Sequence, residues 1–186
     1  MNVPGALFAL YLGLCGGLIR EVARGRPFAG DDQGLRASGS WRLEPAAESS
    51  AAAPEQCSTL ADRVHRQVNE FRREHALEPL TLDPLISEEA IKHSAEMALI
   101  GRTISHRGFD ARLENIRKRI PVRAAAENVA AAKGEKDPAR TVVEGWTKSA
   151  GHRKNMLGDF SLTGVGVAQS KDGTYFFTQI FVKSAN

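Results

Sequence analysis

Residues 146–157, WTKSAGHRKNML, combine the end of a helical pattern, a glycine and a group of polar side chains in one short stretch. The helical pattern starts after Asp137-Pro138, since aspartate followed by proline is a common way for a helix to begin. One face of this helix is apolar or small: Ala139, Val142, Val143, Trp146 and Ala150. Gly151 then stands where many helices end in a left-handed residue. The stretch therefore predicts a helix that closes at Gly151 and a loop that starts at His152.

Two further helices are predicted on the amino-terminal side of this stretch. Residues 58–76 carry an apolar stripe with helical spacing, and Ser58 or Thr59 is expected to cap that helix. Asp83-Pro84 repeats the aspartate-proline start signal, and a second apolar face follows it as far as Gly101. Three helices are thus expected before the loop at His152.

The carboxyl-terminal part changes to a strand pattern. Residues 163–170 and 174–182 are rich in β-formers, and Asp172-Gly173 between them is a strong hairpin signal. The second run is apolar at both alternating sets of positions, so both faces of the sheet must be covered. The predicted fold class is α+β, a three-layer α-β-α sandwich with a central, mainly antiparallel sheet.

Length and composition favour one folded domain. The chain has 186 residues, and 25 basic against 22 acidic side chains give a net charge of only +3. This charge does not indicate a nucleic-acid partner or, by itself, a membrane surface. Cys15 and Cys57, the two cysteines, lie outside the region expected to fold. They predict neither a disulfide framework nor a catalytic thiol.

The amino terminus has a different character. Residues 3–19 are uncharged and apolar, so residues 1–19 are expected to be a signal peptide or a membrane anchor, with 3–19 as the membrane tether. No basic residue precedes the run, and Arg20, Arg24 and Arg26 follow it, which by the positive-inside rule favours a cytoplasmic downstream chain. Residues 20–57 are expected to be a flexible linker, which leaves 58–186 as the domain.

A series of motifs runs in order through this domain: NEFRREHALEPLTLDPLI, HSAEM, ISH, AENVA, WTKSAGHRKNML, TGVGVA and FFTQIF. The series resembles the CAP superfamily, also called SCP or PR-1, and is most similar to its bacterial-type, disulfide-free branch. The resemblance implies an α-β-α sandwich, a secreted or cell-envelope protein, and a central cleft that in many members holds two histidines and two glutamates. Lipid or sterol binding, metal binding and proteolysis are the activities it suggests.

The resemblance transfers only half of that four-residue cleft. His106 in ISH and Glu127 in AENVA match the first histidine and a glutamate of the family pattern. Ser149 stands where the second glutamate is expected, and Phe176 stands where the second histidine is expected. Two interpretations of His152 stay open: it compensates for the missing histidine, or it closes the carboxyl end of the preceding helix.

These residues lead to two hypotheses about function. The first is a secreted or envelope-associated domain that binds a small hydrophobic ligand, an envelope component or a divalent cation such as zinc or magnesium. His106, Glu127, His152 and Ser149 would bind the ligand, with His106 and Glu127 as the metal ligands. The alternative is a hydrolase, a peptidase or esterase, that uses Ser149, His152 and Glu127 or a weakly bound metal. No cofactor is certain, and whether the protein is an enzyme stays open.

A basic run adds a further possibility to weigh. Its members are Arg112, Arg117, Lys118, Arg119 and Arg123. The run is suited to phosphate, anionic lipid or an acidic polymer, but the favoured interpretation is a solvated helix face, because apolar residues at helical spacing lie between its members. His93 beside the apolar seam of residues 84–100 is expected to be structural.

Overall fold

The computed structural model describes residues 52–100 and 103–185. The predicted signal peptide or anchor, Cys15 and residues 20–51 of the predicted linker lie outside the described residues. Within the described ranges, none of the helices is long and apolar enough to span a membrane.

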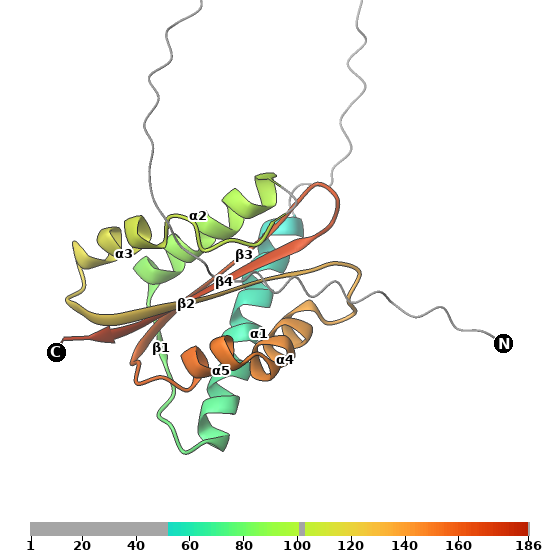
Figure 1. Cartoon of the computed structure of the whole chain (residues 1–186). Helices are drawn as coiled ribbons and strands as arrows, with labels where there is room; N and C mark the ends of the chain where they lie inside the picture. Colours follow the sequence, from blue (N-terminus) through green and yellow to red (C-terminus); the bar gives the residue numbers. More distant parts are fainter. Residues whose placement is uncertain (1–51, 101–102, 186) are drawn as a thin grey trace, which may run out of the picture. The chain divides into compact units, whose positions relative to one another are not determined.

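Five helices and a sheet make up the described part of the chain. The helices are α1 (Ala52–Glu74), α2 (Pro84–Ile100), α3 (Phe109–Arg117), α4 (Pro138–Lys148) and α5 (Ala150–Met156). Figure 1 shows α2 and α3 on one face of the sheet, and α1, α4 and α5 on the other. The predicted α-β-α sandwich is therefore confirmed.

The described strands are β1 (Thr81–Leu82), β2 (Val122–Ala132), β3 (Leu162–Gln169) and β4 (Tyr175–Ser184), in the sheet order β1-β3-β4-β2. β4 pairs antiparallel with both β3 and β2, which confirms the predicted hairpin. The short β1 pairs in parallel with β3, so the sheet is mixed at this edge. β2, at the other edge, carries the candidate site.

The first helix starts earlier than predicted. Ser58 and Thr59 are not caps, because their hydroxyl groups donate to the Glu55 carbonyl at 2.9 and 3.0 Å inside the helix. α1 begins at Ala52 and takes in residues 52–57 of the predicted linker, including the half-buried, unbridged Cys57. Alanine, glutamate and glutamine favour helix, and a proline in the first turn sacrifices no helical hydrogen bond.

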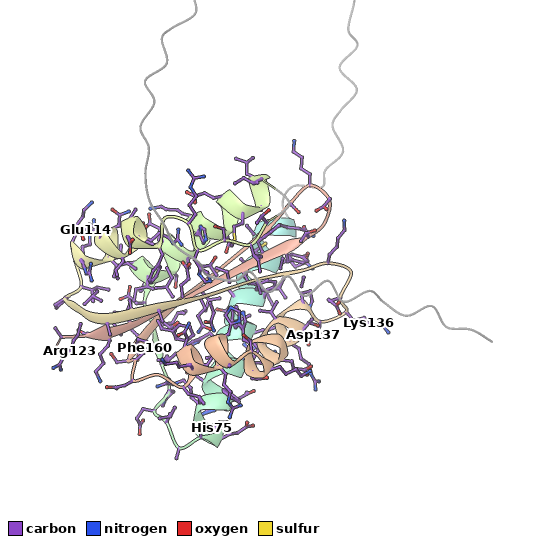
Figure 2. All side chains as sticks on the ribbon, viewed as in Figure 1. His75, Glu114, Arg123, Lys136, Asp137 and Phe160 are labelled. Atoms are coloured by element: carbon purple, nitrogen blue, oxygen red, sulfur yellow. The ribbon has the colours of Figure 1, made fainter. Side chains whose placement is uncertain are left out.

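The two predicted aspartate caps are both formed. Asp83 Oδ1 accepts a hydrogen bond from the Ile86 amide at 3.0 Å, and Asp137 Oδ1 accepts one from the Arg140 amide at 3.1 Å. Figure 2 shows Asp137 at the amino end of α4. These caps satisfy helix amides that have no partner within their own helix, and so determine where α2 and α4 begin.

The prediction that Gly151 ends a helix is wrong. α4 already ends at Lys148, and Ser149 has an extended conformation, with φ −91° and ψ 119°. The chain re-enters a helix at once, and the Ser149 carbonyl accepts from the Arg153 amide at 2.8 Å. Gly151 lies inside α5, and His152 follows it on the same helix rather than in a loop. The extended Ser149 makes the break, so no left-handed glycine is needed.

Both faces of β4 are buried, as the pattern of its apolar residues predicts. Phe177 and Phe181 pack with Val64, Val68 and Trp146 on the face covered by α1 and α4. On the opposite face, a second apolar group lies under α2 and α3: Ile86, Ala90, Ile116, Ile180 and Val182.

The glycines of TGVGVA serve the contact between α2 and β3. A Cβ atom on Gly164 would lie 2.2 Å from the Ile86 backbone, and one on Gly166 would lie 2.2 Å from the Ala90 backbone. Two glycines in one strand thus let α2 lie directly on β3. The motif is a packing element of the sandwich.

Candidate functional site

The site is built along β2, the edge strand that pairs only with β4 in the described sheet. Trp146 of α4 donates its indole N–H to the Val129 carbonyl at 3.3 Å, and Asn155 of α5 donates to the Glu127 carbonyl at 3.2 Å. The Asn155 amide also donates to Asn128 Oδ1 at 2.9 Å. Side chains of the 146–157 stretch therefore satisfy backbone carbonyls of an edge strand that would otherwise need water or another strand.

Glu127 is the buried centre of the site. Its side chain is 1% exposed and lies on the face of β2 that is covered by α2 and α3, since its register partner is Ile180. Glu127 Oε2 accepts two hydrogen bonds from Arg112 of α3, from Nε at 3.0 Å and from Nη2 at 2.7 Å. These two charge-assisted hydrogen bonds to one oxygen fix the orientation of the carboxylate.

His106 lies against the other oxygen of the same carboxylate. Its Nδ1 is 2.9 Å from Glu127 Oε1, and its side chain is 53% exposed. An ionised carboxylate can only accept hydrogen bonds, so Nδ1 carries the proton and donates it. In the neutral imidazole, Nε2 then keeps its lone pair. The buried ion pair thus presents a basic nitrogen at the surface.

The backbone on both sides of His106 is also held in place. His93 of α2 is buried, and its Nε2 lies 2.6 Å from the Ser105 carbonyl. Arg112 Nη1 donates to the Arg107 carbonyl at 2.9 Å. The expectation that His93 is structural agrees with this contact, and the contact also helps to position His106.

Ser149 and His152 form a second pair near this imidazole. Ser149 Oγ lies 3.0 Å from His152 Nδ1, and the His152 ring centroid is 6.4 Å from that of Trp146. Burial lowers the pKa of His152 below its ordinary value, and the charge that His106 carries when protonated lowers this pKa further. Both effects favour the neutral form of the His152 imidazole.

The predicted site residues thus form two pairs rather than one catalytic array. Both oxygens of Glu127 are engaged by His106 and Arg112, and no hydrogen bond among the described residues joins Glu127 to His152. A serine-histidine-acid arrangement needs an acid that orients the histidine. Ser149 and His152 lack that acid in the structure.

The predicted metal ligands also lack a third partner. The described ranges contain no group of three or more histidine, cysteine, aspartate or glutamate side chains that could hold a metal ion. Protein zinc sites normally have at least three such ligands. Glu127 accepts three hydrogen bonds already, so its carboxylate is better placed to orient His106 than to bind a cation.

The two positions where the chain departs from the family pattern have different surroundings. Phe176, at the place of the second histidine, is 2% exposed and packs with Met97 and Val129. Ser149 lies beside His152. Phe176 thus contributes to the core where the family pattern has its second histidine. Ser149 offers a neutral hydroxyl group where the pattern has its second glutamate.

Arg112 is the site residue that the sequence interpretation missed. The prediction of a solvated helix face is wrong for this residue, because Arg112 is 6% exposed and points at Glu127. The other members of the basic run, Arg117, Lys118, Arg119 and Arg123, are exposed, and Figure 2 shows Arg123 directed away from the sheet. Arg112 lies four residues before the buried Ile116 on the same side of α3, and this spacing is the available signal.

Comparisons with known proteins agree with this architecture. A family model described as the cysteine-rich secretory protein family, CAP, matches residues 65–181. The uncharacterized protein YkwD of Bacillus subtilis is 31% identical over 134 residues, which are 70% of this chain and 50% of that protein. The chain thus spans about half the length of this curated relative.

Two solved structures are similar as well. An extracellular protein of Bacillus anthracis that contains an SCP domain is 27% identical with a TM-score of 0.58, over 77% of this chain and 45% of that chain. An outer surface protein of Borrelia burgdorferi, 21% identical with a TM-score of 0.58, shares the fold over 68% of this chain and 93% of that chain. The match to the family model covers more than half of the sequence, and the fold agrees with it. The chain therefore belongs to the CAP, or cysteine-rich secretory protein, family.

Proposed function

We propose that this domain works outside the cytoplasm or at the cell envelope and binds a small ligand at the β2 edge. His106 and His152 contact the ligand, Ser149 contributes a hydroxyl group, and Glu127 orients His106. The extracellular description of the similar Bacillus anthracis protein supports the location, as does the apolar run at residues 3–19.

The observation that carries the proposal is the exposed His106 imidazole held by a buried, arginine-paired carboxylate. Holding a polar group in one orientation before binding reduces the entropy lost when a ligand arrives. The Glu127 carboxylate that holds His106 is itself fixed by two hydrogen bonds from Arg112. The arrangement favours a ligand that donates a hydrogen bond to His106 Nε2, such as the hydroxyl group of a lipid or of an envelope component.

A divalent cation is the weaker form of this proposal. Two imidazoles are a small donor set, so we expect zinc to bind weakly and reversibly and magnesium, which prefers oxygen ligands, to bind less well. Zinc titration of the full chain, followed by histidine NMR signals, tests this form. Broadening or shifts at His106 and His152 are expected, and an unchanged spectrum excludes the cation.

The small-ligand form is tested by identifying what the protein carries. The full chain and its His106→Ala variant are purified in parallel from the same cells, and their extracts are compared by mass spectrometry. A compound that is enriched with the wild type and depleted with the variant supports the proposal. Lys154→Ala, on the exposed side of α5, is the matched control and should retain the compound. Equal extracts from all three proteins count against a ligand at His106.

A second candidate function rests on the 3.0 Å contact between Ser149 Oγ and His152 Nδ1. A serine beside a neutral histidine is the start of a hydrolytic site, although its orienting acid is missing. A screen with simple esters and peptides, using Ser149→Ala as the control, decides this candidate. Activity that survives the substitution excludes a serine mechanism.

A further inference from the structure

The outer face of α2 exposes large apolar side chains beside a charged pair. The large hydrophobic residues that are exposed in the described ranges are Leu82, Ile91, Leu99 and Ile100, at 40%, 49%, 88% and 72% exposure. They lie on α2 or in β1 directly before it. With 3.6 residues per turn, Pro84, Ile91 and Leu99 fall on one side of the helix, and the buried Ile86 and Met97 fall on the other.

This face has a projection at one end and a hollow at the other. A surface hollow of about 440 Å³ at the amino end of α2 is lined by Leu82, Pro84 and Ile91, among others. Leu99 projects from the carboxyl end, with most of its surface in water. Large exposed apolar side chains on one helix face are typical of interaction sites in soluble proteins.

We propose that this face binds a second copy of the chain, with the two α2 helices packed antiparallel about a two-fold axis near Ile91. In such a pair, residues equally far from Ile91 on its two sides face each other. Pro84 at the start of one helix therefore meets the Ala98–Leu99 end of the other, and the projecting Leu99 approaches the hollow. The contact is made twice by symmetry, so the assembly closes as a dimer.

The charges on the face are also self-complementary. Glu88 and Lys92 lie on either side of Ile91 and are paired within the helix at 2.8 Å. The antiparallel arrangement places Glu88 of one copy within about two residues, roughly 3 Å along the axis, of Lys92 of the other. Opposite charges then meet across the interface in both directions. Small residues on either side of this pair, Ser87 and Ala95, allow the helices to approach closely.

A second copy explains the face better than a lipid surface does. Glu88 lies in the middle of the apolar residues, where it would be repelled by anionic lipid and costly to bury in acyl chains, whereas the dimer offers it Lys92 as a partner. One helix face covers less area than the roughly 800 Å² per partner of a standard interface. The dimer is therefore expected to be weak and to depend on protein concentration.

Cross-linking of the full chain in intact cells tests the arrangement. Cys15 and Cys57 are replaced by serine, and one new cysteine is introduced as Ile91→Cys or, in the control, as Lys154→Cys on the exposed side of α5. A short bis-maleimide should give several-fold more dimer with Ile91→Cys than with the control. Equal amounts of dimer from the two variants would overturn the proposal.

Charge reversal tests the same interface with the cross-linking cysteine kept at position 91, so that the compared proteins differ only in charge. In the Ile91→Cys background, Glu88→Lys should reduce the cross-linked dimer about tenfold, because like charges then meet twice across the interface. Lys92 is kept, since it also pairs with the buried Glu89 at 3.0 Å, and the neutral Glu88→Gln should reduce the dimer less than Glu88→Lys. Glu144→Lys, in the matched exposed pair with Arg140 on α4, should have no effect. A Glu88→Lys variant that leaves the dimer unchanged would contradict the arrangement.

Discussion

Arg112 and Glu127 form an ion pair between α3 and the edge strand β2, in which Nε and Nη2 donate to Oε2 at 3.0 and 2.7 Å and both side chains are almost fully buried. The other oxygen of the same carboxylate holds His106 at 2.9 Å. One buried pair therefore both fastens α3 to the sheet and orients the exposed imidazole. Loss of either partner is expected to affect stability and the site together.

Removal of the arginine should leave an uncompensated buried carboxylate. Arg112→Met keeps most of the side-chain volume, and we expect it to lower the free energy of unfolding by about 3–5 kcal/mol, as measured by urea denaturation. The double variant Arg112→Met with Glu127→Gln should recover much of that loss, since the unpaired charge is gone. Arg117→Met, on the exposed side of α3, is the control and should change stability by less than about 0.5 kcal/mol. A similar small change for Arg112→Met would show that the pair is unimportant for folding.

Two glycine substitutions should have opposite effects. Gly151 lies inside α5, and a Cβ atom added to it would meet no atom within 4 Å beyond its own helix, so Gly151→Ala should stabilise the protein by up to about 1 kcal/mol through helix propensity. Gly164→Ala should destabilise it by at least about 1–3 kcal/mol, because the new methyl group would meet the Ile86 backbone. Thermal unfolding of both variants measures the difference. Destabilisation by Gly151→Ala would favour the left-handed helix end predicted from the pattern.

The stability of the protein should fall as the pH drops through the range where unfolded histidine is protonated. Burial, and then the charge of His106, lowers the pKa of His152 in the folded protein, so the unfolded chain binds the proton more readily. Above the unfolded pKa of about 6.5 this group does not change the free energy of unfolding. Below it, the loss of stability grows until the pH reaches the lowered folded pKa, and then stays constant. His152→Gln should show a smaller loss of stability between neutral and acidic pH than the wild type. Identical pH profiles would exclude His152 as a contributor.

The influence of His106 on that titration can be separated from burial. His106→Gln removes the positive charge, so the pKa of His152, followed by NMR, should rise toward its ordinary value but stay below it, because burial is the larger cause. His65→Gln, on α1 with its ring 3.0 Å from the Leu80 carbonyl oxygen, is the control and should leave the pKa of His152 unchanged. No rise with His106→Gln would mean that the two imidazoles are not coupled.

Local signals predicted those parts of the fold that depend on a few neighbouring residues. Asp83 and Asp137 cap helices, and Asp172-Gly173 turns a hairpin, because each effect acts within one turn of chain. Residues 122–132, VRAAAENVAAA, gave no such signal, since alanine favours helix and only pairing with β4 makes this segment a strand.

The candidate site, too, could be predicted only in part from the sequence. The resemblance to the CAP family pointed to His106 and Glu127, and the structure brings them together. The charge of Arg112 predicts that it is exposed to solvent. Only the three-dimensional position of Glu127 shows why an arginine is buried there. Likewise, no residue with a strong turn preference marks the extended Ser149, which separates α4 from α5 and so leaves His152 on α5.

The tautomer of His106 tests the central claim most directly. If the arginine-paired Glu127 carboxylate orients this imidazole, long-range nitrogen-proton NMR should show the proton on Nδ1 and a free lone pair on Nε2 in the neutral wild-type protein. Glu127→Gln should weaken or reverse that preference, because the amide of glutamine can donate as well as accept. A wild-type His106 with its proton on Nε2, unchanged by Glu127→Gln, would contradict the account.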